Sequence, residues 1–246
     1  MTEKDIYTVC ASSNLLETNN CWDSVKALSQ LEFKPFGDIA SPLFNEDEKG
    51  ILMVLFLEDL VPNEDVDIDT LKELHSSFLE QIKRKVASTN KPFIVCWGRE
   101  NNQHVIELAS SENNRTKFHI WITNQLKDLR DEFGHFLLVT LDDIFFQFGA
   151  KNMFSDRNWY FARCRLSVQG LKVLTDAVSA LMNRLINAPS KVLVLDCDNT
   201  IWGGVIGEDG ISGLVLGQDG LGTAFVDFHI FSLIFLNKSQ ILTTIS

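Results

Sequence analysis

Short apolar runs alternate with helical stripes along this chain, and this alternation restricts the possible folds more than any other feature. Apolar side chains recur at helical spacing over residues 71–86 and 171–185, and more weakly over residues 22–28. The runs between these stripes are nearly continuous in apolar residues, as strands covered on both faces of a sheet are. They span residues 6–10, 51–56, 93–96, 136–141 and 192–195. The pattern predicts an α/β fold with a parallel sheet and right-handed crossovers.

Local signals indicate where these elements begin and end. Thr70 and Glu73 have the spacing of a capping box at the start of the first long stripe. Polar stretches at residues 101–103 and 110–117 predict loops, and Pro189 follows the last helical stripe. A new strand and a new motif begin just after it. We therefore expect an α/β domain over residues 1–187 and a partial second domain over residues 188–246.

Charge and cysteine usage exclude several classes of protein. The formal net charge is −11 and the basic residues do not cluster, so no nucleic-acid partner is expected. Five cysteines without CxxC spacing, and an N-terminus without a secretion signal, predict a cytoplasmic protein with reduced thiols. The most apolar segment, residues 230–236, is much shorter than the roughly 20 residues that cross a bilayer, so no membrane association is expected.

The string KVLVLDCDNTIWGGVIGEDG, residues 191–210, contains the chemically informative residues. An apolar strand ends directly in Asp196, and Asp198 follows two residues later. Because ligands of an open α/β sheet bind at the carboxyl ends of its strands, both acids are expected at a site position. A threonine and two adjacent glycines come next, namely Thr200, Gly203 and Gly204.

This arrangement suits phosphoryl transfer. A carboxylate can attack phosphorus to give an aspartyl-phosphate, which divides one difficult displacement into two easier ones. A second acid can protonate the leaving oxygen and later activate water. Mg²⁺ would offset the repulsion between carboxylate and phosphate, and backbone N–H groups of the following loop can hold phosphate oxygens. The predicted cofactor is therefore Mg²⁺.

The DxDxT element with its preceding strand and following WGGVIGEDG resembles the haloacid dehalogenase (HAD) superfamily. The longer string LDCDNTIWGGVIGEDG looks like the FkbH-like branch, of the HAD-IIIC type. That resemblance implies a phosphatase and glyceryl transferase of polyketide-type biosynthesis, which takes a phosphorylated three-carbon acid and loads a glyceryl unit onto an acyl carrier protein. The segments VLFLEDLV and SDRNWYFARCRLS resemble that branch's N-terminal domain, a flavodoxin-like, SGNH-like α/β unit.

The resemblance also implies residue roles. Asp196 would be the nucleophile and a Mg²⁺ ligand, and Asp198 the general acid/base with its backbone carbonyl on the metal. Thr200 would steady the loop, with Gly203 and Gly204 at the phosphate. The flap over the substrate would span residues 202–210, including Trp202, Glu208 and Asp209.

The chain departs from the family pattern after this string. A complete site needs a Ser or Thr at the next strand end, a Lys and a later pair of acids. Ser246, Thr243 and Thr244 are candidates for the first of these. No Asp or Glu follows Asp227, and Lys238 has no supporting context. Because metal affinity depends on the number and charge of the ligands, we expect a truncated chain with little or no phosphatase activity.

Three alternatives stay open. Cys197, between the two acids, is either a small apolar residue or a tether for an acyl group. Ser12 and Ser13 follow the first strand, where an esterase of the SGNH type places its nucleophile. No histidine occurs near the stretch 156–159 that should supply its partner, so a turn-forming role is favoured for both serines. The whole chain could also be a non-catalytic module that docks a carrier protein.

Overall fold

The computed structural model describes residues 5–44, 48–61, 66–100, 114–187, 192–238 and 241–245. The chain forms two compact units, residues 1–183 and 184–246, which we describe separately. The unit boundary lies within the last turn of helix α9.

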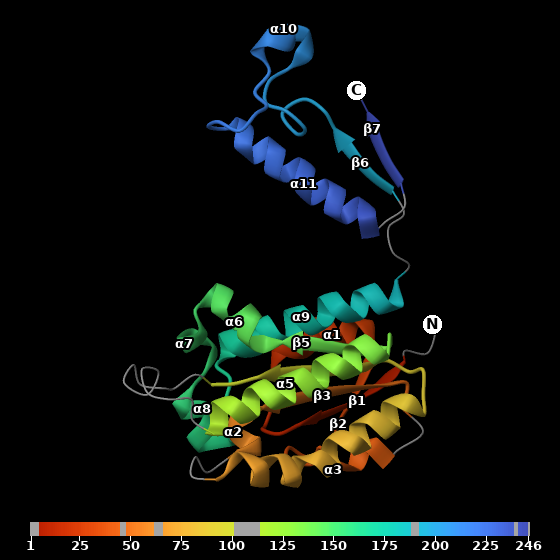
Figure 1. Ribbon diagram of the computed structural model, residues 1–246, viewed down its shortest axis with the longest axis vertical. Helices are drawn as coiled ribbons and strands as arrows, with labels where there is room; N and C mark the ends of the chain where they lie inside the picture. Colours follow the sequence, from red (N-terminus) through yellow and green to blue (C-terminus); the bar gives the residue numbers. More distant parts are fainter. Residues whose placement is uncertain are drawn as a thin grey trace. The chain divides into compact units, whose positions relative to one another are not determined.

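The N-terminal unit is built on a five-stranded, all-parallel sheet with the strand order β2-β1-β3-β4-β5 (Figure 1). Its strands are β1 (Ile6–Ala11), β2 (Gln30–Phe33), β3 (Gly50–Phe56), β4 (Phe93–Gly98) and β5 (Phe136–Thr140). This is the flavodoxin-like strand order. All strands are parallel, but successive strands are added on one side of β1 first and then on the other, so the topological switch point lies between β1 and β3. The predicted α/β fold with a parallel sheet is confirmed.

Helices cover both faces of this sheet, so β3 and β4 are buried throughout (Figure 1). On one face lie α1 (Asp23–Leu28), α6 (Leu141–Phe148) and α9 (Val168–Ile186). On the other lie α3 (Ile68–Ala87) and α5 (Asn114–Glu132). Shorter helical turns complete the unit: η1 (Asn20–Trp22), η2 (Ser41–Phe44), α2 (Leu57–Leu60), α7 (Ala150–Met153) and α8 (Asp156–Ala162).

One close approach fixes how α9 packs. A Cβ placed on Gly170 would lie 2.1 Å from the backbone carbonyl oxygen of Met153, far inside contact distance. Glycine is needed here because the helix and the end of α7 meet backbone to backbone.

Two sequence-based expectations about helix ends are wrong. Helix α3 begins at Ile68, two residues before Thr70, because the carboxylate of Asp67 accepts the N–H groups of Asp69 and Thr70 and caps the helix. The polar residues from Asn114 onward begin α5 rather than a loop. Its buried face comes from widely spaced side chains such as Phe118 and Ile122, which a short polar window does not reveal. The remainder of the expected loops, residues 101–103 and 110–113, lies outside the described residues.

The C-terminal unit contains a two-stranded parallel sheet of β6 (Val192–Asp196) and β7 (Ile241–Ile245), with α11 (Gly222–Lys238) alongside it (Figure 1). A further helix, α10 (Ile206–Gly213), projects beyond the carboxyl end of β6 and is interrupted at Gly210. Val194 is 55% exposed, so the expectation that β6 is covered on both faces is wrong. The physical reason is that β6 has one strand neighbour among the described residues.

No helix in the described part of the chain has both the length and the apolarity needed to span a membrane.

Candidate active site

Asp196 is the last residue of β6, so its carboxylate stands at the carboxyl end of the strand, as the sequence pattern predicts. It is exposed, and its Oδ1 accepts a hydrogen bond of 2.8 Å from the backbone N–H of Cys197. In the sheet register Asp196 lies opposite Ile245, which brings the carboxyl end of β7 level with it. A ligand at Asp196 would therefore meet the ends of both strands.

Asp198 is half-buried and faces the segment that follows it. Its Oδ1 accepts hydrogen bonds from Nε1 of Trp202 at 3.2 Å and from the backbone N–H of Ile206 at 3.4 Å. The indole thus ties this carboxylate to the start of the predicted flap. This contact holds the acid in one orientation, which a proton donor requires.

The turn after Asp198 is held by its own backbone and by Asn199. The backbone N–H groups of Thr200 and Ile201 donate to the carbonyl of Cys197 at 3.3 and 2.9 Å. Asn199 adopts a left-handed φ of 56°, and its side-chain oxygen accepts the N–H of Gly204 at 2.9 Å. Asn tolerates this conformation better than most residues. Thr200 therefore lies within the turn, and its role in steadying the loop stays a prediction.

The predicted flap belongs to a loop whose two ends are hydrogen-bonded to each other. Gly203 and Val215 exchange two backbone hydrogen bonds, of 2.9 and 2.8 Å, which close its base. Gly204 has a φ of 100°, a conformation that side chains with a Cβ rarely adopt. The carboxylate of Asp209 accepts the N–H of Val205 at 2.8 Å and so caps the start of α10. Glu208 is exposed on the same helix.

Helix α11 anchors the turn from behind. Nε2 of His229 lies 2.8 Å from the carbonyl oxygen of Ile201, and a Cβ on Gly203 would come within 2.9 Å of the Phe225 ring. The predicted residues between 196 and 209 are therefore gathered into one local structure. Which of them act on a substrate stays a prediction.

Cys197 is only 9% exposed, although it lies between the two acids. Its backbone carbonyl organises the turn by accepting two hydrogen bonds. A buried thiol in a tight turn fits the small-apolar interpretation better than the acyl-tether interpretation, because a tether must reach an incoming acyl group.

The carboxylate residues at this site supply the oxygen ligands that Mg²⁺ prefers, but they are few. Asp196 and Asp198 both accept the hydrogen bonds described above through Oδ1. Mg²⁺ is commonly held by one or two carboxylates together with water and substrate phosphate. No cluster of three or more metal-ligating side chains occurs in the described ranges.

The candidates for the second phosphate-binding element fall on β7. Thr243 and Thr244 pair with Val194 and Leu195, and they lie two positions and one position before Ile245, the partner of Asp196. Ser246, the other candidate, lies outside the described residues.

The carboxyl edge of the N-terminal sheet does not have the geometry of an esterase. The Ser12 hydroxyl donates to Oδ2 of Asp59 at 2.7 Å and accepts the N–H of Phe56 at 3.0 Å. Its own backbone N–H donates to the carbonyl of Val54 at 3.0 Å, so it is not available to hold an oxyanion. Ser13 is 2% exposed. The structure favours the turn-forming role for both serines.

A cluster of largely buried charged side chains at this edge was not predicted from the sequence. Arg165 bonds through Nε and Nη2 to Oδ1 of Asp59, at 2.9 and 2.5 Å, and through Nη1 to Glu100 at 3.2 Å. Its guanidinium also lies 4.1 Å from the centre of the Trp159 ring. The two segments quoted as family-like, VLFLEDLV and SDRNWYFARCRLS, are thus joined by an ion pair. No signal in either segment alone could have found this contact, because it joins residues far apart in the sequence.

Glu58 and His119 are the strongly perturbed groups of this edge. Burial raises the pKa of Glu58 to about 7, against the smaller opposing effects of backbone hydrogen bonds and of the Arg115 and Arg165 charges. Burial, with the nearby charges of Arg99 and Lys127, lowers the pKa of His119 to about 4. His119 is therefore neutral at neutral pH, and its 3.5 Å approach to a carboxylate is not an ion pair there.

Comparison with known proteins supports the fold. No family model matches the chain, and no curated protein matches it closely enough to count as a relative. Among solved structures, the N-terminal part of a Bacteroides fragilis protein, which contains a phosphatase domain and was solved in complex with Mg, aligns with a TM-score of 0.80. It is 16% identical, and the alignment covers 98% of this chain and 68% of that one. At this identity the likeness shows a shared fold.

Two further structures align less well. One is from Streptococcus pneumonia and is named for platelet activating factor, and the other is from Slackia heliotrinireducens and is named for SGNH hydrolases. Each has a TM-score of 0.48 and 12% identity, over 74% of this chain and 85% and 100% of the respective structures. Scores this low carry no conclusion.

Proposed function

We propose that the chain carries the nucleophile half of an aspartate-dependent phosphoryl-transfer site of the FkbH-like branch. Its substrate would be the acyl phosphate of a phosphorylated three-carbon acid. Hydrolysis at phosphorus would consume this acyl phosphate, whereas glyceryl transfer would use it intact: the thiol of an acyl carrier protein attacks the acyl carbon, and the bond from that carbon to the bridging oxygen breaks, which releases inorganic phosphate. The observation that carries the proposal is the placement of Asp196 at the carboxyl end of β6, with Asp198 held toward the flap by Trp202. The shared fold with a phosphatase-domain protein supports it.

The proposed hydrolysis at Asp196 has two steps. The Asp196 carboxylate attacks phosphorus, so that a new O–P bond forms as the bond from phosphorus to the leaving oxygen breaks. Asp198 gives its proton to that oxygen. In the second step Asp198 takes a proton from water, whose oxygen attacks the phosphorus of the aspartyl-phosphate and releases phosphate and the free Asp196 carboxylate. The flap's role would be to exclude bulk water during the first step.

Mg²⁺ bound at this position would be held by the carboxylate of Asp196 and the backbone carbonyl of Asp198, and it would neutralise charge on the phosphoryl oxygens. One carboxylate and one carbonyl give a small ligand set, so we expect weak metal affinity and slow turnover.

An assay of acetyl phosphate hydrolysis with and without Mg²⁺ tests the catalytic proposal. We expect slow, Mg²⁺-dependent release of phosphate by the chain, abolished by Asp196→Asn and retained by Asp219→Asn, an exposed acid outside the turn and flap. A version extended with the family's late Lys and acid pair should turn over faster. Equal rates for wild type and Asp196→Asn would remove the basis of the proposal.

The glyceryl transfer step is tested separately. A tether at Cys197 would place the acyl group on this residue as a thioester, and peptide mass spectrometry after incubation with the acyl phosphate would detect it. Because the thiol is 9% exposed, we expect no acyl adduct and direct transfer to the carrier protein.

The second candidate function is a non-catalytic module that docks a carrier protein through its N-terminal unit. The specific observation in its favour is that, among the described residues at the carboxyl edge of that unit, the hydroxyl of Ser12 is bonded to Asp59 and Asp59 is paired with Arg165, so Ser12 is not available as a nucleophile. A chain that binds a carrier protein but shows no Mg²⁺-dependent hydrolysis, even when extended, would favour this function.

A further inference from the structure

Helix α8 has an unusual surface for a unit with a well-filled core. None of its residues is buried, although it contains three consecutive aromatic residues. Tyr160 and Phe161 are 77% and 85% exposed, and Phe146 and Phe148 on α6 are 82% and 50% exposed. Four of the six exposed aromatic side chains described in the N-terminal unit therefore fall between residues 146 and 161. Exposed apolar groups in such density mark surfaces that contact other molecules.

The same stretch is basic, whereas the chain as a whole is acidic. Lys151, Arg157 and Arg163 are exposed and form no ion pair within the part of the chain that the structure describes. Two of these cations lie over aromatic rings. The guanidinium carbon of Arg157 is 6.0 Å from the centre of the Phe161 ring, and that of Arg163 is 5.2 Å from the centre of the Trp159 ring. In a chain with a formal net charge of −11, unpaired cations beside exposed aromatic groups favour an acidic partner.

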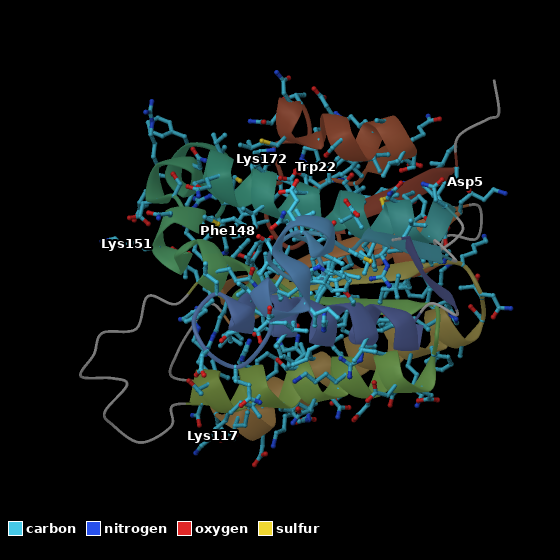
Figure 2. All side chains as sticks on the ribbon, turned by 90° about the horizontal axis from the view of Figure 1, so that it is seen from above. Asp5, Trp22, Lys117, Phe148, Lys151 and Lys172 are labelled. Atoms are coloured by element: carbon cyan, nitrogen blue, oxygen red, sulfur yellow. The ribbon has the colours of Figure 1, made fainter. Side chains whose placement is uncertain are left out.

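We use "the α8 surface" for Phe146, Phe148, Lys151, Arg157, Tyr160, Phe161 and Arg163. Figure 2 shows Lys151 at the edge of the view.

Buried contacts fix the α8 surface in place. Arg165, held by two carboxylates, stacks 4.1 Å from the centre of the Trp159 ring and so supports the helix from below. The side chain of Asn14, at the end of β1, donates to the carbonyl of Ala162 at 2.8 Å. That of Asn158 donates to the carbonyl of Leu166 at 2.8 Å. A surface that is already ordered loses little conformational entropy when a partner binds.

We propose that the α8 surface is the docking site for a small acidic helical protein. Because this inference rests on the carrier-protein partner of the proposed function, we assign the carrier protein to it. Acidic side chains of one of its helices would approach Lys151, Arg157 and Arg163, and an apolar stripe of the same helix would cover Tyr160 and Phe161. A lipid surface fits less well, because the chain's net charge of −11 opposes anionic lipids and a helix of seven residues inserts little apolar area.

The test is a binding measurement with the full chain and purified acyl carrier protein, in the apo form and in the form bearing its prosthetic arm. The variants are Arg157→Glu and Phe161→Ser, both at exposed positions of α8. The matched controls are Lys117→Glu and Ile120→Ser on α5, which covers the far face of the sheet and lies apart from Lys151 in Figure 2. Binding requires no turnover, so a failure of docking is distinguishable from a failure of the phosphatase proposal.

We expect the carrier protein to bind, each α8 variant to bind about tenfold or more weakly, and both controls to bind like wild type. Affinity should fall as salt is raised. No binding, or equal loss in the α5 controls, would overturn the proposal. If the carrier protein does not bind, two other results would assign the α8 surface to a different partner and overturn the proposal. These are binding of the chain to phosphatidylserine vesicles and self-association that Phe161→Ser weakens.

Discussion

Replacing Glu58 by glutamine removes a carboxyl group whose pKa the fold raises from an ordinary value of 4.5 to about 7. Glu58 follows β3 directly, and its side chain is 11% exposed beside Arg115 at 3.5 Å. Burial penalises the ionised carboxylate more than the neighbouring arginine charges and backbone hydrogen bonds stabilise it. The folded state therefore prefers the neutral acid, and glutamine is close to that acid in shape.

The shifted pKa of Glu58 sets both the direction and the size of its effect on the unfolding free energy as the pH changes. Because the folded pKa lies above the unfolded one, the contribution of this group to stability is fully present below pH 4.5 and is lost as the pH rises through 7. One pKa unit is worth about 1.36 kcal/mol, so the full loss is roughly 3 kcal/mol. Between pH 5.5 and pH 8.5, roughly 2 kcal/mol of it should appear.

Urea denaturation followed by tryptophan fluorescence measures this loss, since four of the five tryptophans belong to the N-terminal unit. The difference in unfolding free energy between Glu58→Gln and wild type should grow by roughly 2 kcal/mol from pH 5.5 to pH 8.5, in favour of the variant. Glu80→Gln, on the exposed surface of α3, should show no such growth. If the difference were flat with pH, or if the variant lost stability at high pH, the assignment of burial as the dominant effect would be wrong.

Two substitutions and one titration test other features of the N-terminal unit. Gly170→Ala should lower the unfolding free energy by about 1–3 kcal/mol because its Cβ would lie 2.1 Å from the Met153 carbonyl oxygen, whereas Gly134→Ala, with open space around it, should have little effect in the same denaturation assay. Arg165→Met should destabilise by about 3–5 kcal/mol, because it leaves two largely buried carboxylates without their cation. The imidazole of His119 should show no titration in NMR spectra between pH 5.5 and pH 8, since its pKa is lowered to about 4.

The apolar runs predicted the core strands of the sheet because both faces of β3 and β4 are buried, which leaves a continuous hydrophobic signature. Strand β2 was missed for the opposite reason. It lies at the edge of the sheet, and its sequence QLEF alternates exposed and partly buried residues over only four positions. Such a segment is specified by its pairing with β1 rather than by its own composition.

The local site was predictable because its residues are contiguous. Asp196, Asp198 and the flap lie within one short segment, so spacing alone placed them at the end of a strand and in the turn that follows. The Arg165–Asp59 ion pair joins residues 106 positions apart, and no local pattern encodes such a contact. The exposure of Val194 was likewise invisible, because burial of a strand depends on neighbours that the strand's own sequence does not contain.

Trapping the covalent intermediate tests the central claim most directly. The full chain is incubated with acetyl phosphate at high Mg²⁺ concentration, quenched, and searched by peptide mass spectrometry for a phosphorylated aspartate. We expect the phosphoryl group on Asp196, absent in Asp196→Asn and in samples without Mg²⁺, and present in Asp219→Asn. A folded chain that carries no phosphoryl group on Asp196, or that is labelled equally after the Asp196→Asn substitution, would contradict the assignment of this carboxylate as the nucleophile.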